Sequence, residues 1–227
     1  MLFYSPLSLL PIMKEMIIRH YQPGDREAIF QIACDTAFFG DPVEAYLEDR
    51  RLFFDAFYRY YTNYEPQHAW VVDEGERAIG FLMGCTNSQR HDRLMALWML
   101  PGTLLRSLLG RYRFGPRTWT YLKALVKAGR QGEFPEAAYQ DYPAHLHINI
   151  EQGWRGYGLG RKLIQAYLDQ LKTEGINGVH LNTTDRNVAA CKLYESMGFH
   201  LLDARKTELW SFLFPEPVEN RLYGKEL

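Results

Sequence analysis

The chain has 227 residues, of which 47% are hydrophobic and 15% aromatic, so it can bury a full core within one domain. Its formal charge of −1 by itself says nothing about a nucleic-acid partner, and no such partner is expected. Cys34, Cys85 and Cys191 are scattered, without a CxxC pair or zinc spacing. This pattern favours buried thiols over disulfides or nucleophiles, and it predicts a reducing cytoplasm as the location.

Residues 1–15 are apolar in patches, but Pro6 and Pro11 interrupt them and no positive charge precedes the apolar stretch. The segment is a poor signal peptide and too short to span a bilayer. We expect either a poorly ordered N-terminal extension or an upstream start codon, with Met13 or Met16 as the true start. No other stretch is long and apolar enough for a membrane span, so we predict no membrane partner and a single domain over residues 16–227.

The domain is expected to begin with a strand over residues 16–21 and a helix from Pro23 to about Ala37. A second helix is predicted over residues 43–61, where the aromatic side chains favour a core position. Residues 70–72 and 78–84 then read as a hairpin around an acidic, glycine-containing turn.

The next strand is delayed until Ala144, which predicts an insertion at about residues 87–143. Helical spacing is visible at 94–109 and 119–128. Between residues 89 and 132 the single acid is Asp92, whereas the bases are Arg90, Arg93, Arg106, Arg111, Arg113, Arg117, Lys123, Lys127 and Arg130. This basic segment is either an ordinary solvated surface or an electrostatic collar for an anionic ligand.

The most informative stretch runs from His145 to Phe199. It predicts a strand over 145–150, a glycine turn over 155–160, a helix from about Arg161, a strand over 179–184 and a second helix ending near Phe199. Glycines without Cβ atoms allow a sharp turn and close approach of an anion to backbone N–H groups. The following helix would direct its positive end at the same place. Strand, turn and helix together predict a pyrophosphate cradle.

Of three phosphate-binding patterns, this turn fits one. The Walker pattern fails because Gly160 is followed by Arg161-Lys162-Leu163, and a dinucleotide fingerprint fails because the glycines are spaced by two. Arg/Gln-x-x-Gly-x-Gly/Ala fits, through Arg155, Gly158 and Gly160. A tight strand-to-helix turn without a ligand is the other interpretation of these residues.

A second motif follows at the separation expected for one known family: Asn187, and then a helix that ends in Leu-Tyr-Glu-Ser-Met-Gly-Phe at residues 193–199. With both motifs in order, the chain resembles the GNAT superfamily of acetyl-coenzyme A-dependent acyltransferases over most of residues 16–214. The resemblance implies an α/β fold with a mixed central sheet, flanked by helices. It also implies that the sheet is V-split between the strand before the loop and its neighbour, and that the predicted helices of residues 23–61 flank the acceptor side.

The resemblance also implies site residues. The main chain of Ile148 and Ile150 would bind pantetheine and polarise the acetyl carbonyl, and Asn187 would contact the coenzyme or hold a water. Tyr194 would bind at the thioester and protonate the coenzyme A sulfur, or else it is a core aromatic near a helix end. The pyrophosphate would contact the loop residues Arg155, Gly156, Tyr157, Gly158, Leu159, Gly160 and Arg161.

The general base is less constrained. Strand alternation places His145, His147 and Asn149 on one face of the sheet, and a neutral imidazole suits amine deprotonation near pH 7. We predict His147 as the base or as a water-positioning group, although a histidine on a sheet face is often structural. Glu151, Asp141 and Asp185 are the alternatives. The two histidines have no third metal ligand at a suitable spacing, so no metal is expected.

A narrower resemblance is carried by residues 60–66, 97–101 and 142–148. These segments are similar to the acetyltransferase-like domain attached to the animal O-linked N-acetylglucosaminidase. That domain lacks an intact pyrophosphate loop, whereas this chain keeps one and has no room for a glycosidase domain. The resemblance therefore points to the acetyltransferase lineage.

The predicted activity is direct transfer of acetyl from acetyl-coenzyme A to a primary amine of a small molecule or peptide in a ternary complex. Ping-pong transfer through Cys191 is not expected, because the helical position of this residue faces away from the motifs. The insertion is expected to form a wall of the acceptor cleft, and its arginines predict a preference for anionic acceptors. A monomer or homodimer is expected. The alternative is a coenzyme A-binding sensor or interaction module without catalysis.

Overall fold

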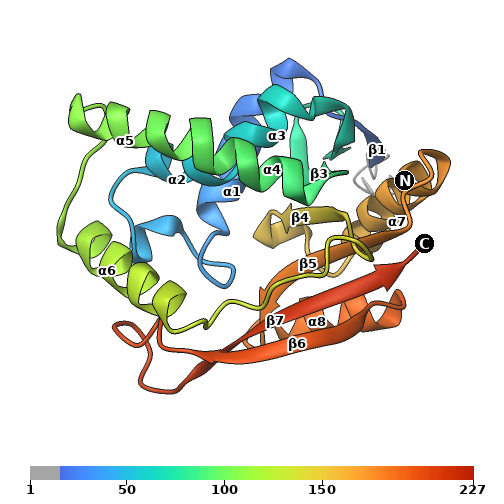
Figure 1. Cartoon of the computed structure of the whole chain (residues 1–227). Coiled ribbons are helices and arrows are strands. Elements are labelled where there is room, and N and C mark those ends of the chain that lie inside the picture. The colour runs from blue at the N-terminus through green and yellow to red at the C-terminus, as the bar shows by residue number, and fades with distance from the viewer. Residues whose placement is uncertain (1–15) are drawn as a thin grey trace, which may run out of the picture.

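The computed structural model describes residues 16–227 and contains a seven-stranded mixed sheet in the order β1-β2-β3-β4-β5-β7-β6 (Figure 1). Residues 1–15, predicted to form an extension, lie outside the described residues. The strands are β1 (Ile17–His20), β2 (Ala69–Asp73), β3 (Ala78–Cys85), β4 (Ala144–Ile150), β5 (Gly178–Thr184), β6 (His200–Thr207) and β7 (Val218–Glu226). Only β4 and β5 pair in parallel, and every other neighbouring pair in this sheet is antiparallel.

The β4–β5 pair opens into a V. The two strands are in register only at Ala144 with Val179 and His145 with His180. On its other edge β4 stays paired with β3 as far as Ile150. The second half of β4 therefore presents one edge of its main chain to a cleft instead of to a neighbouring strand. This opening confirms the predicted mixed, V-split sheet.

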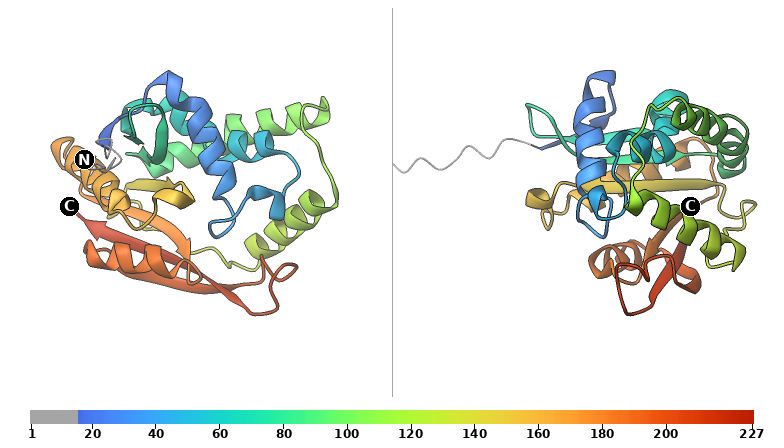
Figure 2. Two further views of the ribbon diagram at one scale, coloured as in Figure 1. Left: turned by 180° about the vertical axis from the view of Figure 1, so that it is seen from behind. Right: turned by 90° about the vertical axis from the view of Figure 1, so that its left-hand side faces the viewer.

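Helices cover both faces of the sheet (Figures 1 and 2). One face packs against α1 (Arg26–Asp35), α2 (Arg50–Phe57) and α3 (Arg59–Tyr64) through a core that includes Phe81 and Met83 of β3. The other face packs against α7 (Leu159–Thr173) and α8 (Val188–Ser196). Short 3-10 turns are η1 (Pro23–Asp25), η2 (Val43–Ala45), η3 (Pro66–His68) and η5 (Gln152–Trp154).

The predicted continuous helix over residues 43–61 is wrong. Asp49 accepts a hydrogen bond from the Arg51 N–H and caps α2, which therefore begins only at Arg50. Tyr58, at φ −116°, then separates α2 from α3. Helical periodicity alone does not detect these two interruptions, because the apolar positions continue across them.

Between β3 and β4 the chain forms α4 (Ser88–Leu94), a π-helical turn η4 (Met95–Met99), α5 (Leu100–Leu108) and α6 (Pro116–Arg130). The π turn lies just before Pro101, whose ring removes a backbone donor from the ladder. Glu48 fixes the start of α6, since its carboxylate accepts hydrogen bonds from the backbone N–H groups of Arg117 and Thr118 at 2.9 Å each. This contact attaches the segment to the helices before β2.

The C-terminal hairpin was not predicted as a pair. β7 lies between β5 and β6, so the last strand of the chain completes the interior of the sheet. Its sequence, Val-Glu-Asn-Arg-Leu-Tyr-Gly-Lys-Glu, lacks a clean hydrophobic alternation. In the connection before it, Trp210 packs on Tyr121 with ring centroids 5.7 Å apart, and Phe214 stacks on Phe38 at 5.4 Å. Among the described residues, no helix combines the length and apolar character that a bilayer span requires.

Candidate functional site

The glycine turn adopts the backbone that the sequence requires of it. Gly156 and Gly158 have φ values of +84° and +75°, a left-handed conformation that side chains with a Cβ rarely adopt. Gly158 immediately precedes α7, which begins at Leu159, two residues earlier than predicted. The first N–H groups of a helix have no partner inside it, and the helix dipole adds positive potential there. The turn and the helix start can therefore bind an anion.

A pocket of about 370 Å³ opens over this turn. Of the predicted coenzyme-binding residues, it is lined by Ile148, Ile150, Arg155, Gly156, Gly158, Leu159, Gly160, Arg161, Asn187 and Tyr194. The Arg155 Nε donates to the Ile150 carbonyl at 3.1 Å, and the Arg161 guanidinium donates to the Ser196 hydroxyl at 2.6 Å. Residues from β4, the turn, α7 and α8 thus meet around one cavity.

Tyr157 is the exception among the loop residues. It is 62% exposed and does not line the pocket, and its ring lies 6.3 Å from that of Trp154. The pocket is also lined by residues that the sequence did not identify as coenzyme-binding: Thr36, Phe39, Gly40, Asn149, Trp154, Ala189, Ala190 and Leu193. The turn after α1 was visible only as a helix break, because it carries no phosphate-binding or thioester-binding pattern.

A cleft of about 240 Å³ follows the split between β4 and β5 and shares several wall residues with the loop pocket. Ile148 and Tyr194 line both spaces, and His147 lines the cleft from β4. Asn149 is held rigidly between them, since its amide donates to the Thr36 hydroxyl at 2.7 Å and its carbonyl accepts from the Tyr58 hydroxyl at 3.1 Å. The cleft therefore joins the predicted coenzyme and base positions.

Tyr194 is 5% exposed, and its ring lies 5.9 Å from that of Tyr223 and 6.0 Å from that of Phe199. Burial raises the pKa of Tyr194, so the phenol stays protonated across the physiological range. Within residues 16–227 its hydroxyl has no hydrogen-bond partner, which leaves the O–H available to a bound molecule.

His147 lies where several spaces meet. Part of its side chain is exposed to solvent. The ring itself packs among other protein groups, including Tyr58 and Tyr61, whose ring centroids lie 6.0 and 5.4 Å away. This desolvation, with His91 and His180 nearby, lowers the pKa of His147 to about 4. The imidazole is therefore neutral at physiological pH and keeps a lone pair, although a lower pKa also makes it a weaker base.

The alternative bases are placed elsewhere. The Glu151 carboxylate forms an ion pair with Arg77 at 2.7 Å, and the Asp185 carboxylate accepts from the Glu219 N–H at 2.9 Å. Asp141 is exposed just before β4. None of these three carboxylates lines the loop pocket or the cleft.

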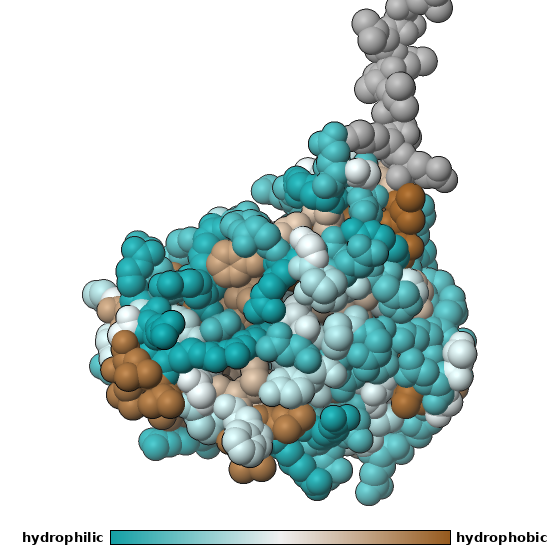
Figure 3. Space-filling view, turned by 90° about the horizontal axis from the view of Figure 1, so that it is seen from above, coloured by the Kyte–Doolittle hydropathy of each residue, from teal (hydrophilic) through white to brown (hydrophobic). Residues whose placement is uncertain are grey.

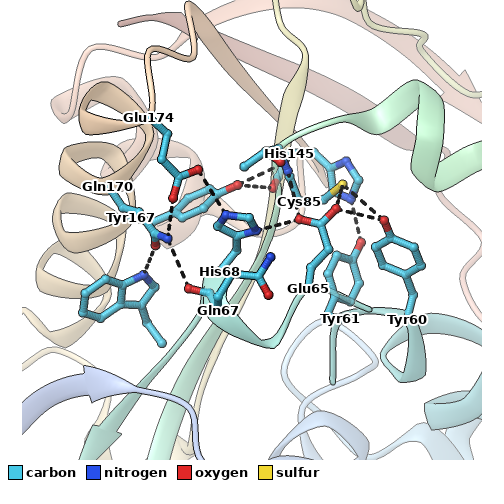
Figure 4. Close-up of polar contacts among 12 residues, drawn as sticks. Tyr60, Tyr61, Glu65, Gln67, His68, Cys85, His145, Tyr167, Gln170 and Glu174 are labelled. Atoms are coloured by element: carbon cyan, nitrogen blue, oxygen red, sulfur yellow. Dashed lines mark hydrogen bonds and ion pairs between the residues drawn. The ribbon is translucent and has the colours of Figure 1, made fainter. Parts of the chain in front are cut away.

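The start of β4 is fixed by buried polar groups (Figure 4). His145 bonds through Nε2 to the Tyr61 hydroxyl and through Nδ1 to the Ser88 hydroxyl, each at 2.7 Å. Tyr167 of α7 donates to the carbonyls of Cys85 and His145 at 3.0 and 3.2 Å. His145 is thus a structural residue, whereas its neighbour on the same face, His147, is open to the cleft.

A neighbouring part of the network contains charged groups. The Glu65 carboxylate accepts from the Tyr60 hydroxyl at 2.9 Å and pairs with His68 Nδ1 at 2.6 Å, and His68 Nε2 contacts Glu174 at 3.1 Å (Figure 4). Burial alone would raise the pKa of Glu65, but the bonds from His68 and Tyr60 outweigh it and hold that pKa below its ordinary value. Burial opposes protonation of His68, yet the two carboxylates raise its pKa.

A larger cavity, of about 1020 Å³, lies under the helices between β3 and β4. Its walls come from α2, η4, α5, α6 and the segments beside them, and His147 lines it as well. The insertion therefore contributes walls to this cavity, and its predicted place beside the acceptor stays a prediction. None of the lining residues of this cavity is an arginine or lysine, so the basic residues of the insertion do not form its wall. Several of those bases point to partners outside: Arg106 pairs with Asp55 at 3.5 Å and Lys127 with Glu208 at 2.5 Å.

The remaining candidates stay outside the site. In the described part of the chain, no group of three or more His, Cys, Asp or Glu side chains is arranged to hold a metal ion. The three cysteines are buried and unbridged. The Cys191 thiol contacts the Thr184 carbonyl at 3.5 Å and lines neither the loop pocket nor the cleft.

The segment that matches a known family includes the glycine turn and α8. Residues 134–199 match the acetyltransferase (GNAT) family. A 56-residue segment is 43% identical to mycothiol acetyltransferase of Nocardiopsis dassonvillei, covering 25% of this chain and 17% of that protein. A 61-residue segment is 35% identical to the [ribosomal protein bS18]-alanine N-acetyltransferase of Salmonella typhimurium, covering 27% and 41%. The matches thus span less than half the length of these relatives.

Solved structures match over the whole fold. The crystal structure of SsHAT is 31% identical, with a TM-score of 0.70, and the alignment covers 93% of this chain and 98% of that one. An acetyltransferase structure from Salmonella typhimurium, solved with its cofactor acetyl-CoA, shares the fold at a TM-score of 0.56 and 15% identity, covering 94% of each chain.

Proposed function

The chain belongs to the acetyltransferase (GNAT) family, and from this premise we propose that it transfers acetyl from acetyl-coenzyme A to a primary amine by direct attack. The observation that carries the proposal is a continuous series of shared walls. Ile148 and Tyr194 join the glycine-turn pocket to the β4–β5 cleft, and His147 joins that cleft to the large cavity. The anion-binding turn, the cleft and the space proposed for a second substrate therefore lie next to one another.

The glycine turn suits the diphosphate of the coenzyme. Backbone N–H groups at the start of α7 would bind the phosphate oxygens, and the guanidinium of Arg155 adds charge beside them. The relative solved with acetyl-CoA shares this fold. The unpaired edge of β4 at Ile148 and Ile150 offers main-chain groups for pantetheine, and an N–H there would polarise the thioester carbonyl.

In the proposed reaction the amine nitrogen attacks the thioester carbonyl carbon, a C–N bond forms and the C–S bond breaks. The departing sulfur needs a proton, and the free, protonated Tyr194 hydroxyl is the donor in the cleft. The attacking amine must lose a proton, and neutral His147 would accept it directly or through a water. With its pKa of about 4, His147 suits the positioning of a water better than the storage of a proton.

The competing function is coenzyme A binding without catalysis. Acetyl-coenzyme A should be incubated with a panel of primary amines while free thiol is measured and the acetylated amine is identified by mass spectrometry. Release of coenzyme A with formation of an N-acetyl product supports the transferase. Tight coenzyme binding without product over the whole panel would assign the sensor function instead.

Three buried, unbridged cysteines suit a reducing compartment, and we propose the cytoplasm as the location. For the oligomeric state, we propose a monomer or a homodimer. The segments similar to the O-linked N-acetylglucosaminidase-associated domain include Tyr60, Tyr61 and His145, which belong to the polar network beneath β4. We propose common descent with that domain for this reason.

A further inference from the structure

Resting on the proposed acetyl transfer, we propose that the acceptor is a primary amine attached to an extended alkyl or arylalkyl body, which occupies the large cavity beneath α5 and α6. The cavity is lined on one side by Leu47, Leu52, Phe53 and Phe57 and on the other by Leu100, Leu104, Leu108, Phe114, Trp119, Leu122 and Leu125. A space with such walls favours an occupant that loses apolar surface to water when it binds.

The cavity is large enough for a whole organic substrate. Its volume of about 1020 Å³ lies at the upper end of the roughly 300–1,000 Å³ typical of small-molecule sites. The loop pocket, at about 370 Å³, and the cleft, at about 240 Å³, are smaller and more polar in their residues. The coenzyme and the second substrate therefore face walls of different chemistry.

Three of the hydroxyl groups that line the cavity, those of Tyr61, Ser107 and Tyr112, are already bonded to other residues. The Ser107 hydroxyl donates to the Thr103 carbonyl at 2.8 Å, and the Tyr112 hydroxyl donates to Asp55 at 2.5 Å. The Tyr61 hydroxyl is bonded to His145 at 2.7 Å. Buried polar groups that are already paired offer little to a charged or polar body.

His147 supplies the direction of binding. Its ring lines both the cavity and the cleft, and within residues 16–227 its nitrogens make no hydrogen bond. An acceptor whose amine lies at His147 and whose body extends beneath α5 would satisfy both environments at once. This arrangement places the nucleophile next to the split of β4 and β5.

α5 provides a matched set of test positions. Leu104 and Leu108 line the cavity, whereas Leu105 and Leu109 are equally apolar and lie outside its lining. The exposed fractions are 62% and 78% for the lining pair and 57% and 68% for the other. Because all four side chains are exposed, a polar replacement of either pair should leave the core intact. Figure 3 shows an apolar patch on the side where α5 lies in Figure 1.

The experiment compares n-butylamine, n-hexylamine and n-octylamine as acceptors with acetyl-coenzyme A. Each buried methylene should raise kcat/KM about fourfold, which gives about a 250-fold increase over the four methylenes from butylamine to octylamine. Leu104→Gln with Leu108→Gln should reduce kcat/KM for octylamine at least tenfold and leave the KM of acetyl-coenzyme A unchanged. The control, Leu105→Gln with Leu109→Gln, should behave as the unmodified protein.

Octylamine binding by calorimetry provides a readout without catalysis. A flat chain-length series with active enzyme, an equal loss in both double variants, or no octylamine binding overturns the cavity assignment. Preference for octanoyl-coenzyme A with short amines also overturns it, because the cavity would then hold the acyl group of the donor. Octylamine binding that the lining pair weakens, with no transfer to any amine, would instead retain the assignment and refute the proposed transferase.

Discussion

The loop pocket and the large cavity are built from different parts of the polypeptide. The loop pocket depends on main chain: two glycines with positive φ, the start of α7 and an unpaired edge of β4. The large cavity depends on side chains contributed by α2, α5, α6 and β4, which are far apart in the sequence. The loop pocket can therefore keep its geometry when many side chains are substituted. In the large cavity, by contrast, each substitution of a lining side chain alters the chemistry of the wall.

This difference separates the two parts of the proposed reaction. A main-chain site suits the invariant diphosphate and thioester of a coenzyme, and a side-chain site suits an acceptor that differs from one relative to the next. Tyr194 and His147 stand at the border between them. Substitutions on either side of that border should therefore affect donor and acceptor kinetics separately.

The largest expected effect is at Tyr194. If its hydroxyl protonates the departing thiolate, Tyr194→Phe should lower kcat by roughly 10²–10⁴ while coenzyme affinity barely changes. Tyr223→Phe is the matched control, since this ring lies 5.9 Å away and its hydroxyl donates to Glu195 at 2.9 Å. Steady-state kinetics and calorimetry measure the two quantities. Near-normal turnover in the Tyr194 variant would make this residue a packing residue.

The next effect concerns the scaffold that both regions share. Glu65 is 3% exposed and His68 6%, and neither lines the loop pocket or the large cavity. Glu65→Ala leaves the buried His68 imidazole with Glu174 as its remaining carboxylate partner. We therefore expect the free energy of unfolding to fall by about 3 kcal/mol. Glu208→Gln, which removes an exposed ion pair with Lys127, should cost less than about 1 kcal/mol. Urea unfolding provides the measurement.

The same pair predicts a pH dependence of stability. Because the pKa of Glu65 is lowered in the folded protein, its ionised carboxylate stabilises the fold at pH values above 4.5, the ordinary pKa of this group. This stabilisation is lost as the pH falls through the lowered pKa. Because the pKa of His68 is raised in the folded protein, its protonated imidazole stabilises the fold at pH values below 6.5, the ordinary pKa of this group. This stabilisation is lost as the pH rises through the raised pKa. The difference between the unmodified protein and Glu65→Ala should be greatest between these two values. An equal difference at pH 5.5 and at a pH above the raised pKa of His68 would contradict the charged pair.

How far the sequence could predict each region follows from the same contrast. Arg155, Gly158 and Gly160 form a local pattern, and the strand, turn and helix around them are short-range structures that the sequence identifies. The sequence around Ser107 and Leu108 does not show that only one face of α5 lines a cavity, because tertiary packing decides which elements form the opposite wall. The arginine collar was inferred from charge density, which does not reveal where long side chains point. β7 was missed because its pairing with β5 and β6 compensates for a weak hydrophobic alternation.

A smaller effect is expected at the turn itself. Gly158→Val places a branched side chain at φ +75°, with no protein atom within 4 Å of the new Cβ, so that the side chain would enter the pocket. We expect acetyl-coenzyme A affinity to fall at least tenfold, about 1.4 kcal/mol. Gly175→Val, at φ +71° and equally open at the other end of α7, should strain the backbone to a similar degree without affecting binding. Equal affinities by calorimetry would remove the loop from the coenzyme site.

The smallest effect is expected from the basic residues outside the large cavity. Arg111 and Arg113 are exposed and absent from its lining, and at physiological salt the interactions of exposed charges are largely screened beyond about 8 Å. Arg111→Glu with Arg113→Glu should therefore change the acceptor KM less than about twofold, since solvated charges contribute little at that range. The Arg113 N–H bond to Asp49 at 2.9 Å survives the change because it uses the main chain. Acceptor kinetics at low and high salt, for n-octylamine and for an amine carrying a carboxylate, measure the effect. The opposite outcome is a higher KM for the carboxylate-bearing amine alone, both in the charge-reversal variant and, at high salt, in the unmodified protein. The basic surface would then contribute to acceptor selection together with the apolar wall.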